Sequence, residues 1–341
     1  MEGTNYSHFV VLSLFMIFLI GLSVEFALFI PWILNQSILL IVLKVVGYNG
    51  VGVGMFLNYA LAIVTDPGRV RKGWYSHDAP PTEPNVGTDV SIQVSQSIQP
   101  PRFCQSCQNY KPPRTHHCKD CRRCVLRMDH HCPWTNNCVG FLNHAHFLRF
   151  LIWTSIGCLM VATIIIWRLV EIVLAIEKGT TKVAERLSIS ELMLLLLPWL
   201  FSSLLTPNTV SKQAGEFIAT DIEIIVIGMD IVMLMPIASV VWLLTSSHLY
   251  WACTNQTTIE VSHRKESNFL VGTRLRGDKN PYDLGFKRNV VQVFGHVWKY
   301  WLVPPFPLGR KVTVGDGHSF EFVGSGKVDL LGEIVNEEKM L

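Results

Sequence analysis

Four long apolar stretches constrain the fold of this chain more than any other feature of its sequence. They run from about Phe9 to Phe29, Leu40 to Val64, Phe147 to Val173 and Ile222 to Tyr250. About 20 apolar residues in a helix cross the roughly 30 Å hydrocarbon core of a bilayer. With 49% hydrophobic and only 16% charged residues among its 341, the chain is too apolar for an ordinary soluble protein. The sequence therefore predicts an integral membrane protein with four transmembrane helices.

A fifth apolar stretch, from Leu192 to Leu205, is interrupted by Pro198. Its ~14 residues are few for a membrane span, so we expect this stretch to lie at the membrane interface or to re-enter the membrane. A fifth span is the alternative. It would move everything after Tyr250 to the other side of the membrane.

Lysine and arginine gather between the second and third apolar stretches. Residues 69–149 are rich in both, whereas the short loop from Pro31 to Gln36 contains neither. The cytosolic loops of membrane proteins carry an excess of these residues. The charge distribution therefore predicts that the segment 69–149 and both termini lie in the cytosol.

The apolar stretches and the composition between them divide the chain into five parts. Residues 1–68 contain transmembrane helices one and two, and residues 69–101 are a cytosolic flexible linker rich in Pro, Ser, Gln and Asn. Residues 102–146 form a cysteine-rich domain, 147–251 contain helices three and four with a lumenal loop, and 252–341 form a cytosolic tail. No internal repeat is apparent. The expected fold is all-α in the membrane, with a small, loop-rich, metal-held domain on the cytosolic side.

Seven of the nine cysteines fall between Cys104 and Cys138, interleaved with histidines. Such a mixture is typical of metal ligation in a reducing compartment rather than of a disulfide framework. Each C-x-x-C pair can place two thiolates on one tetrahedral zinc ion. Two closed sites need eight donors, and the segment supplies Cys104, Cys107, His117, Cys118, Cys121, Cys124, His131 and Cys138. We therefore predict two structural Zn²⁺ ions.

This assignment leaves Cys132 without a metal. It follows Asp129 and His130 closely in the sequence, and an imidazole can take a thiol proton while a carboxylate orients the imidazole. The three residues can therefore form an activated nucleophile. The alternative is that Cys132 is itself a zinc ligand and another donor is spare. Spacing alone leaves both possibilities open.

The run from Asp129 to Phe141, DHHCPWTNNCVGF, closely resembles the signature of the DHHC family of protein S-acyltransferases. Further similar motifs are Lys111 to Cys118, Asp66-Pro67-Gly68, Thr257-Thr258-Ile259-Glu260 and Asn280-Pro281-Tyr282. The resemblance implies a palmitoyltransferase that works by a ping-pong mechanism. In it, Cys132 takes an acyl group from acyl-CoA and passes it to protein cysteines, assisted by His130 and Asp129.

The resemblance also implies how other residues are used. Cys104, Cys107, His117 and Cys124 would bind one zinc, and Cys118, Cys121, His131 and Cys138 the other. Thr258 would brace Asp129, and Asn280 would hold the tail against the membrane domain. The run from Pro304 to Gly309, together with Gly315-Asp316-Gly317, resembles more loosely a fungal subgroup of the family that resides in the endoplasmic reticulum. This resemblance implies that the protein lies in the membrane of the endoplasmic reticulum. The Golgi membrane is the alternative.

The expected co-substrate is palmitoyl-CoA, whose phosphates require cations. Candidates near the nucleophile are Arg102, Lys111, Arg114 and His116, although a general positive-inside role is the alternative for each. Gly157 lies about ten residues, or ~15 Å, into the third helix. We expect its small size to leave room for the end of the acyl chain; close helix packing is the alternative.

The expected partners are the membrane lipid bilayer and substrate proteins with cytosolic juxtamembrane cysteines; nucleic acid is not an expected partner. The alternative function is a membrane-anchored zinc module that recruits a protein without catalysis. Such a module would use all its cysteines as ligands and form no covalent intermediate. Labelling of Cys132 by acyl-CoA therefore distinguishes the two functions.

Overall fold

The computed structural model of the chain describes residue 8 and residues 38–74, 102–177, 221–263, 280–297, 301–304 and 313–321. The predicted first span, most of the linker 69–101 and the apolar stretch from Leu192 to Leu205 lie outside the described residues. The run from Pro304 to Gly309 is described only at Pro304.

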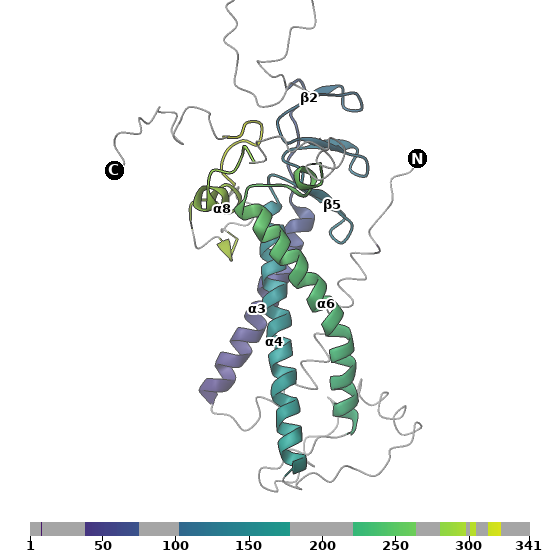
Figure 1. Ribbon diagram of the computed structural model, residues 1–341, viewed down its shortest axis with the longest axis vertical. Coiled ribbons are helices and arrows are strands. Elements are labelled where there is room, and N and C mark those ends of the chain that lie inside the picture. Colours follow the sequence, from purple (N-terminus) through teal and green to yellow (C-terminus); the bar gives the residue numbers. More distant parts are fainter. Residues whose placement is uncertain are drawn as a thin grey trace, which may run out of the picture. The chain divides into compact units, whose positions relative to one another are not determined.

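Three long helices in the described part are apolar enough to cross a membrane (Figure 1). They are α3 (Ile38–Val64), α4 (His144–Glu177) and α6 (Asp221–Cys253). Their apolar windows are 20, 31 and 27 residues long, which is sufficient for a bilayer. The second, third and fourth predicted spans are thereby confirmed as membrane-length helices.

The cysteine-rich segment contains three antiparallel hairpins, each of two strands. They pair β1 (Arg102–Cys104) with β2 (Asn109–Lys111), β3 (His116–Cys118) with β4 (Arg123–Val125), and β5 (His130–Cys132) with β6 (Asn137–Val139). The sequence predicted a small loop-rich domain here, and these short strands were not expected. Strands of three residues carry too little alternation of polar and apolar side chains to be recognised in a sequence.

The three hairpins are one structural unit that recurs every fourteen residues. Cys104, Cys118 and Cys132 end the first strand of each hairpin. The residue before each second strand has a positive φ, 49° at Gln108, 52° at Arg122 and 47° at Asn136, which lets the chain reverse within a short turn. The sequence contains this repeat, but few of the fourteen positions keep the same residue type, so it was missed.

The described helices take part in two compact units of the chain. Among the described residues, one unit comprises those from Gly52 to Thr154 and those from Leu243 onward, and the other comprises residues 38–51 and those from Ser155 to Trp242. The second unit has a core in which Cys158 and Ile164 of α4 lie with Ile227 and Leu234 of α6. The three hairpins belong to the first unit.

Polar side chains attach the third hairpin to the end of α3. The amide nitrogen of Asn137 donates to the carbonyl oxygens of Ala62, Ile63 and Thr65 at 3.2, 3.0 and 3.0 Å. Asn143 donates to Ala62 O at 3.3 Å. The last carbonyls of a helix lack partners within the helix, so these two asparagines satisfy them and fix the hairpin at that end of the span.

The tail after α6 is attached by a short amphipathic helix, α8 (Phe286–Phe294). Its Val290 and Val293 pack against Ala145 and Leu148 of α4 and Ala252 of α6. The burial of these apolar side chains holds the tail beside the helix ends that carry the site.

Candidate active site and metal centres

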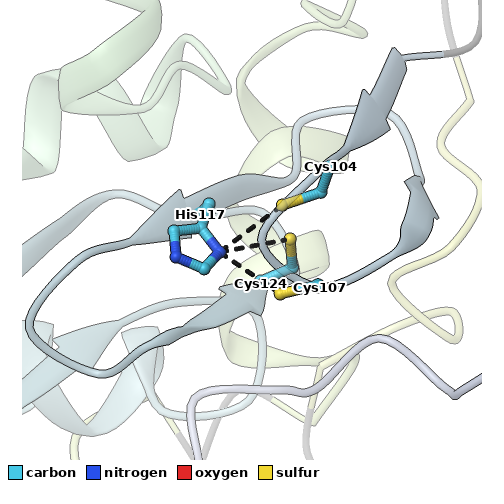
Figure 2. Close-up of side chains that lie close together, drawn as sticks. All are labelled: Cys104, Cys107, His117 and Cys124. Atoms are coloured by element: carbon cyan, nitrogen blue, oxygen red, sulfur yellow. Dashed lines mark hydrogen bonds between the residues drawn. The ribbon is translucent and has the colours of Figure 1, made fainter.

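The first metal centre brings together the donors of the first two hairpins. Nδ1 of His117 lies 3.5 Å from Sγ of Cys104, 3.2 Å from Sγ of Cys107 and 3.9 Å from Sγ of Cys124. Figure 2 shows the three sulfurs gathered around this nitrogen. Tetrahedral zinc, with bonds of about 2.3 Å to sulfur and 2.0 Å to nitrogen, needs donors at such separations. The four residues therefore fit a zinc ion.

The second centre has the same construction one hairpin later. Nδ1 of His131 lies 3.6, 3.4 and 3.6 Å from Sγ of Cys118, Cys121 and Cys138, respectively, and the sulfurs of Cys121 and Cys138 are 3.4 Å apart. Three thiolates and one imidazole are again a typical zinc site. The structure thus brings together the predicted ligands in the two predicted groups of four.

The hairpin repeat explains why the two ligand sets are interleaved. In each centre, one C-x-x-C pair comes from the end of the first strand and the following turn of one hairpin. The remaining histidine and cysteine come from the next hairpin, where His117 faces Cys124 and His131 faces Cys138 across the strand pairs. Each metal would therefore connect two successive hairpins.

The first strand of the third hairpin also ends in a cysteine, but the turn that follows lacks the second cysteine of a ligand pair. Cys132 occupies the position of Cys104 and Cys118, while Thr135 stands where Cys107 and Cys121 supply a second thiol. Cys132 belongs to neither group of metal donors in the described residues. The alternative in which Cys132 is a zinc ligand therefore receives no support from the geometry.

Cys132 is buried with a polar neighbour on one side. Val139, Phe147 and Leu151 pack around it, while the imidazole of His130 is its polar neighbour. Burial alone would raise the pKa of this thiol, but the hydrogen bond to His130 and its charge lower the pKa below the ordinary cysteine value. A lowered pKa increases the thiolate fraction.

His130 is oriented by the buried carboxylate of Asp129. Nδ1 of His130 lies 2.7 Å from Oδ2 of Asp129. Although burial raises the pKa of Asp129, the hydrogen bond from His130 and neighbouring charges hold it well below its usual range. The ionised carboxylate can only accept, so Nδ1 carries the proton and Nε2 is left for Cys132.

The protonated form of His130 is favoured in this arrangement. Burial alone would lower the pKa of His130, but its hydrogen bonds to Asp129 and Cys132 raise the pKa to about 9. The three groups therefore favour an imidazolium beside a thiolate, the combination that activates a cysteine nucleophile.

Thr258 completes the support of the carboxylate. Its hydroxyl donates to Asp129 Oδ2 at 2.6 Å and its backbone N–H donates to Oδ1 at 2.9 Å. The structure thus places Thr258 where the family resemblance implied. With His130, three donors fix both oxygens of Asp129.

Three of the four side chains expected to bind CoA lie close together. Arg102 and Lys111 face each other across β1 and β2, and the ring of His116 stacks on that of His263 with centroids 6.2 Å apart. Burial, followed by the charges of Arg102 and His263, lowers the pKa of His116 to about 4. The sequence reading missed His263, which carries no motif of its own.

The fourth candidate, Arg114, has a different environment. Its side chain is 1% exposed and forms a bidentate ion pair with Glu260, at 2.7 and 2.9 Å. Its guanidinium also lies over the rings of Tyr282 and Phe320, 4.5 and 5.2 Å from their centroids. The expectation that Arg114 binds CoA is therefore corrected: its hydrogen-bonding groups are used within the protein.

Asn280 occupies the position implied for it at the base of the tail. Its amide donates to the backbone oxygens of Thr254 at 2.6 Å and Asn255 at 3.0 Å. These oxygens directly follow α6. The contacts hold the tail against the end of the helix.

Gly157 lies where α4 passes close to α3. A Cβ atom at this position would lie 3.6 Å from Cγ1 of Val51, which is an ordinary packing distance. The contact is consistent with the alternative role of Gly157 in helix packing.

Comparisons with known proteins agree on one family. The family described as DHHC palmitoyltransferase matches residues 97–265. "Probable protein S-acyltransferase 14" of Arabidopsis thaliana is 31% identical over 255 residues, which cover 73% of this chain and 67% of that protein. "Palmitoyltransferase ZDHHC20" of Mus musculus is 33% identical over 232 residues, covering 68% and 51%. "Palmitoyltransferase PFA4" of Mycosarcoma maydis is 30% identical over 263 residues, covering 73% and 47%.

The chain spans about half the length of the mouse and Mycosarcoma maydis relatives. Because similar proteins occur in a plant, an animal and a fungus, these matches do not single out the fungal subgroup that the tail resembles.

Proposed function

Because this chain belongs to the DHHC palmitoyltransferase family and is a protein S-acyltransferase of the membrane, we propose that Cys132 is the thiol that carries the acyl group. The observation that supports this assignment is a buried cysteine outside both metal centres, beside His130, which in turn is hydrogen-bonded to Asp129. The other six cysteines of the segment fall in the two zinc centres.

The first half-reaction would load the enzyme. Nε2 of His130 takes the proton of the Cys132 thiol, and the thiolate attacks the carbonyl carbon of the acyl-CoA thioester. The bond between that carbon and the CoA sulfur breaks, and His130 returns the proton to the departing CoA thiolate. Asp129 balances the charge on His130 while it holds this proton.

The second half-reaction would transfer the acyl group to the substrate protein. A substrate cysteine gives its proton to His130 and attacks the acyl carbon, and the sulfur of Cys132 leaves and regains a proton. One thioester replaces another, so little driving force is needed. The enzyme contributes mainly the positioning of reactants and the management of protons.

The two zinc ions that fit the metal centres would have a structural role. Each would have four protein ligands and no open position, and when bound it supplies folding free energy to hairpins with little apolar core. His131 directly precedes Cys132 in β5. A metal on His131 would thus fix the strand that carries the nucleophile.

We propose that Arg102, Lys111 and His116 bind the phosphates of CoA. Arg102 and Lys111 lie opposite each other across a strand pair, where two like charges are unfavourable. A phosphate bound between them would therefore stabilise the pair. Lys111→Ala should raise the half-saturating concentration of acyl-CoA several-fold with little change in the maximal rate. Lys119→Ala, which removes an exposed cation from the second hairpin, is the control.

We propose that the acyl chain runs along α4 toward Gly157. Phe147 and Gly157 lie on one continuous helix, about 15 Å apart along its axis, and a palmitoyl chain extends about 20 Å. Gly157 is the only residue that we propose to contact the end of the acyl chain. The neighbouring Cys158 packs within the apolar core of its unit.

We propose that the hairpins face the cytosol and that the first apolar stretch makes a fourth span. The excess of lysine and arginine in residues 69–149 supports this orientation. The resemblance of the tail to a fungal subgroup supports the endoplasmic reticulum membrane. Substrate proteins would present cysteines close to the cytosolic membrane surface, within reach of Cys132.

A two-step labelling experiment tests the transfer. The purified protein in lipid nanodiscs is loaded with labelled palmitoyl-CoA, freed of excess CoA, and mixed with a membrane-anchored peptide that contains one cysteine. The label should leave the protein and appear on the peptide as a hydroxylamine-sensitive thioester. A zinc module that only recruits partners would acquire no label in the first step.

A further inference from the structure

A second histidine lies near the same carboxylate oxygen of Asp129 that binds His130. His248 of α6 is 5% exposed, and its Nδ1 lies 3.8 Å from Oδ2 of Asp129. Ionisable side chains in membrane helices are costly and are retained where they meet a polar partner. The partner of His248 here is the carboxylate that orients the proposed base.

His248 also forms part of the wall around the ring of His130. The centroids of the two imidazoles are 5.6 Å apart, and Phe147 lies edge-on to both, 5.3 Å from His130 and 5.2 Å from His248. Trp251 packs edge-on against His248 at 5.0 Å. The three rings of His130, Phe147 and His248 therefore contact one another in pairs and restrict the rotation of His130.

A third histidine, His144 of α4, completes the surroundings of Asp129. It is 2% exposed, and ring nitrogens of His144 and His248 lie with an oxygen of Asp129 within 4.8 Å of one another. In the described residues, neither Nε2 of His144 nor Nδ1 of His248 has a hydrogen-bond partner. Two buried imidazoles with unused nitrogens thus face one carboxylate.

These three side chains resemble a metal site, but the hydrogen bonding of His144 argues against one. Nη1 of Arg127 lies 3.3 Å from Nδ1 of His144. A guanidinium can only donate, so Nδ1 accepts and Nε2 carries the proton. A histidine that ligates a metal usually donates from its other nitrogen, which Arg127 prevents. The arrangement suits hydrogen-bond donors around Asp129 instead.

We propose that His248 is a positioning residue for acyl transfer: with His144 it holds the carboxylate of Asp129, and with Phe147 it keeps the ring of His130 turned toward Cys132. This inference rests on the proposed function of Cys132. A separation of 3.8 Å is beyond the range of a hydrogen bond, and the proposal requires this contact to tighten in the catalytic complex, as long contacts in free enzymes often do. His248 therefore acts on the reaction through Asp129 and His130.

The test compares His248→Gln, which keeps an N–H donor on a side chain of similar reach, with His248→Phe, which keeps the ring and removes the donor. The rate of Cys132 acylation is measured against palmitoyl-CoA concentration in nanodiscs. We expect His248→Phe to lower the maximal rate ~10-fold or more, with an unchanged half-saturating concentration. His248→Gln should restore the rate to within ~3-fold of the unsubstituted protein.

Zinc content and thermal unfolding of every variant separate positioning from folding. The control is His146→Phe, which removes another buried histidine of α4 that contacts Arg149 rather than Asp129; its maximal rate should remain within ~2-fold of the original. Equal rates for His248→Phe and the unsubstituted protein would overturn the inference, as would equally slow Gln and Phe variants. Absence of label on Cys132 in the unsubstituted protein would instead refute the proposed function, and this inference with it.

Discussion

Arg114 and Glu260, 146 residues apart in the chain, form a bidentate ion pair with N–O distances of 2.7 and 2.9 Å. Arg114 precedes the second hairpin, and Glu260 ends the TTIE motif after α6. Tyr282 of the NPY motif lies under the same guanidinium. One ion pair thus connects three sequence motifs whose shared role the sequence does not reveal.

Arg114→Ala should destabilise the protein strongly. Removing one partner of a buried ion pair costs about 3 to 5 kcal/mol, because the other charge is left without compensation. The thermal unfolding temperature in nanodiscs should fall clearly. Arg69→Ala, which removes an exposed cation from a pair with Asp66, is the control and should have little effect. Equal unfolding temperatures for the two variants would contradict the assignment.

The same ion pair predicts a dependence of stability on acid. Burial raises the pKa of Glu260, but the charge and hydrogen bond of Arg114 lower it below the usual value. A lowered folded-state pKa contributes stability that is present above the ordinary glutamate pKa of about 4.3 and is lost as the pH falls further. Unfolding temperatures measured from pH 7 downward should therefore decline below that range. The decline should be smaller in Glu260→Gln, and an identical decline in both proteins would contradict the prediction.

Removal of zinc should inactivate the protein. The hairpins have few apolar residues of their own, so metal binding supplies much of their folding free energy. A strong chelator, or Cys138→Ser, should abolish Cys132 acylation and make the hairpins sensitive to protease. Metal analysis should give two zinc ions per chain in the unsubstituted protein and fewer in Cys138→Ser. Cys158→Ser, outside both centres, should keep two ions; full activity without metal would refute the structural role.

Asp129→Asn should slow the acylation of Cys132 by ~10² or more, because an amide no longer enforces the tautomer and charge balance of His130. Thr258→Val removes the hydroxyl that lies 2.6 Å from Asp129 and should slow the reaction about tenfold. Thr254→Val is the control, since its hydroxyl donates only to backbone oxygens of α6. If the Thr258 and Thr254 variants react equally fast, Thr258 does not support the carboxylate.

Gly157→Phe should shift the preference toward shorter acyl chains if the chain end lies near this position. The measurement is competition between acyl-CoA molecules shorter and longer than palmitoyl-CoA for the labelling of Cys132. Gly157→Ala is the control, because its methyl group would make only an ordinary contact with Val51. An unchanged preference in Gly157→Phe would assign the glycine to helix packing alone.

The sequence was sufficient to predict the three described apolar helices and both ligand sets, because each signal is local or follows a known motif. Helix α4 is a long run of mainly apolar residues with few charges, and each C-x-x-C pair spans only four residues. The pairing of His117 with Cys124 and of His131 with Cys138 follows from the hairpin repeat, which was recognised only in the structure.

Contacts between distant parts of the chain were not predictable from the sequence. Arg114 was a candidate for binding CoA, yet it is buried against Glu260. His248 was an unremarked polar residue in an apolar helix, and its relation to Asp129 depends on the packing of α6 beside the third hairpin. Such relations arise from tertiary packing, which local patterns do not encode.

Mapping of the acyl group gives the most direct test of the central claim. The protein is incubated with palmitoyl-CoA, digested and analysed by mass spectrometry, alongside Cys132→Ser and the control Cys158→Ser, with zinc measured in all three. We predict a hydroxylamine-sensitive palmitoyl group on Cys132, its loss only in Cys132→Ser, and two zinc ions in every sample. An acyl group that persists in Cys132→Ser, or a loss of zinc in that variant, would contradict the assignment of Cys132 as the free nucleophile.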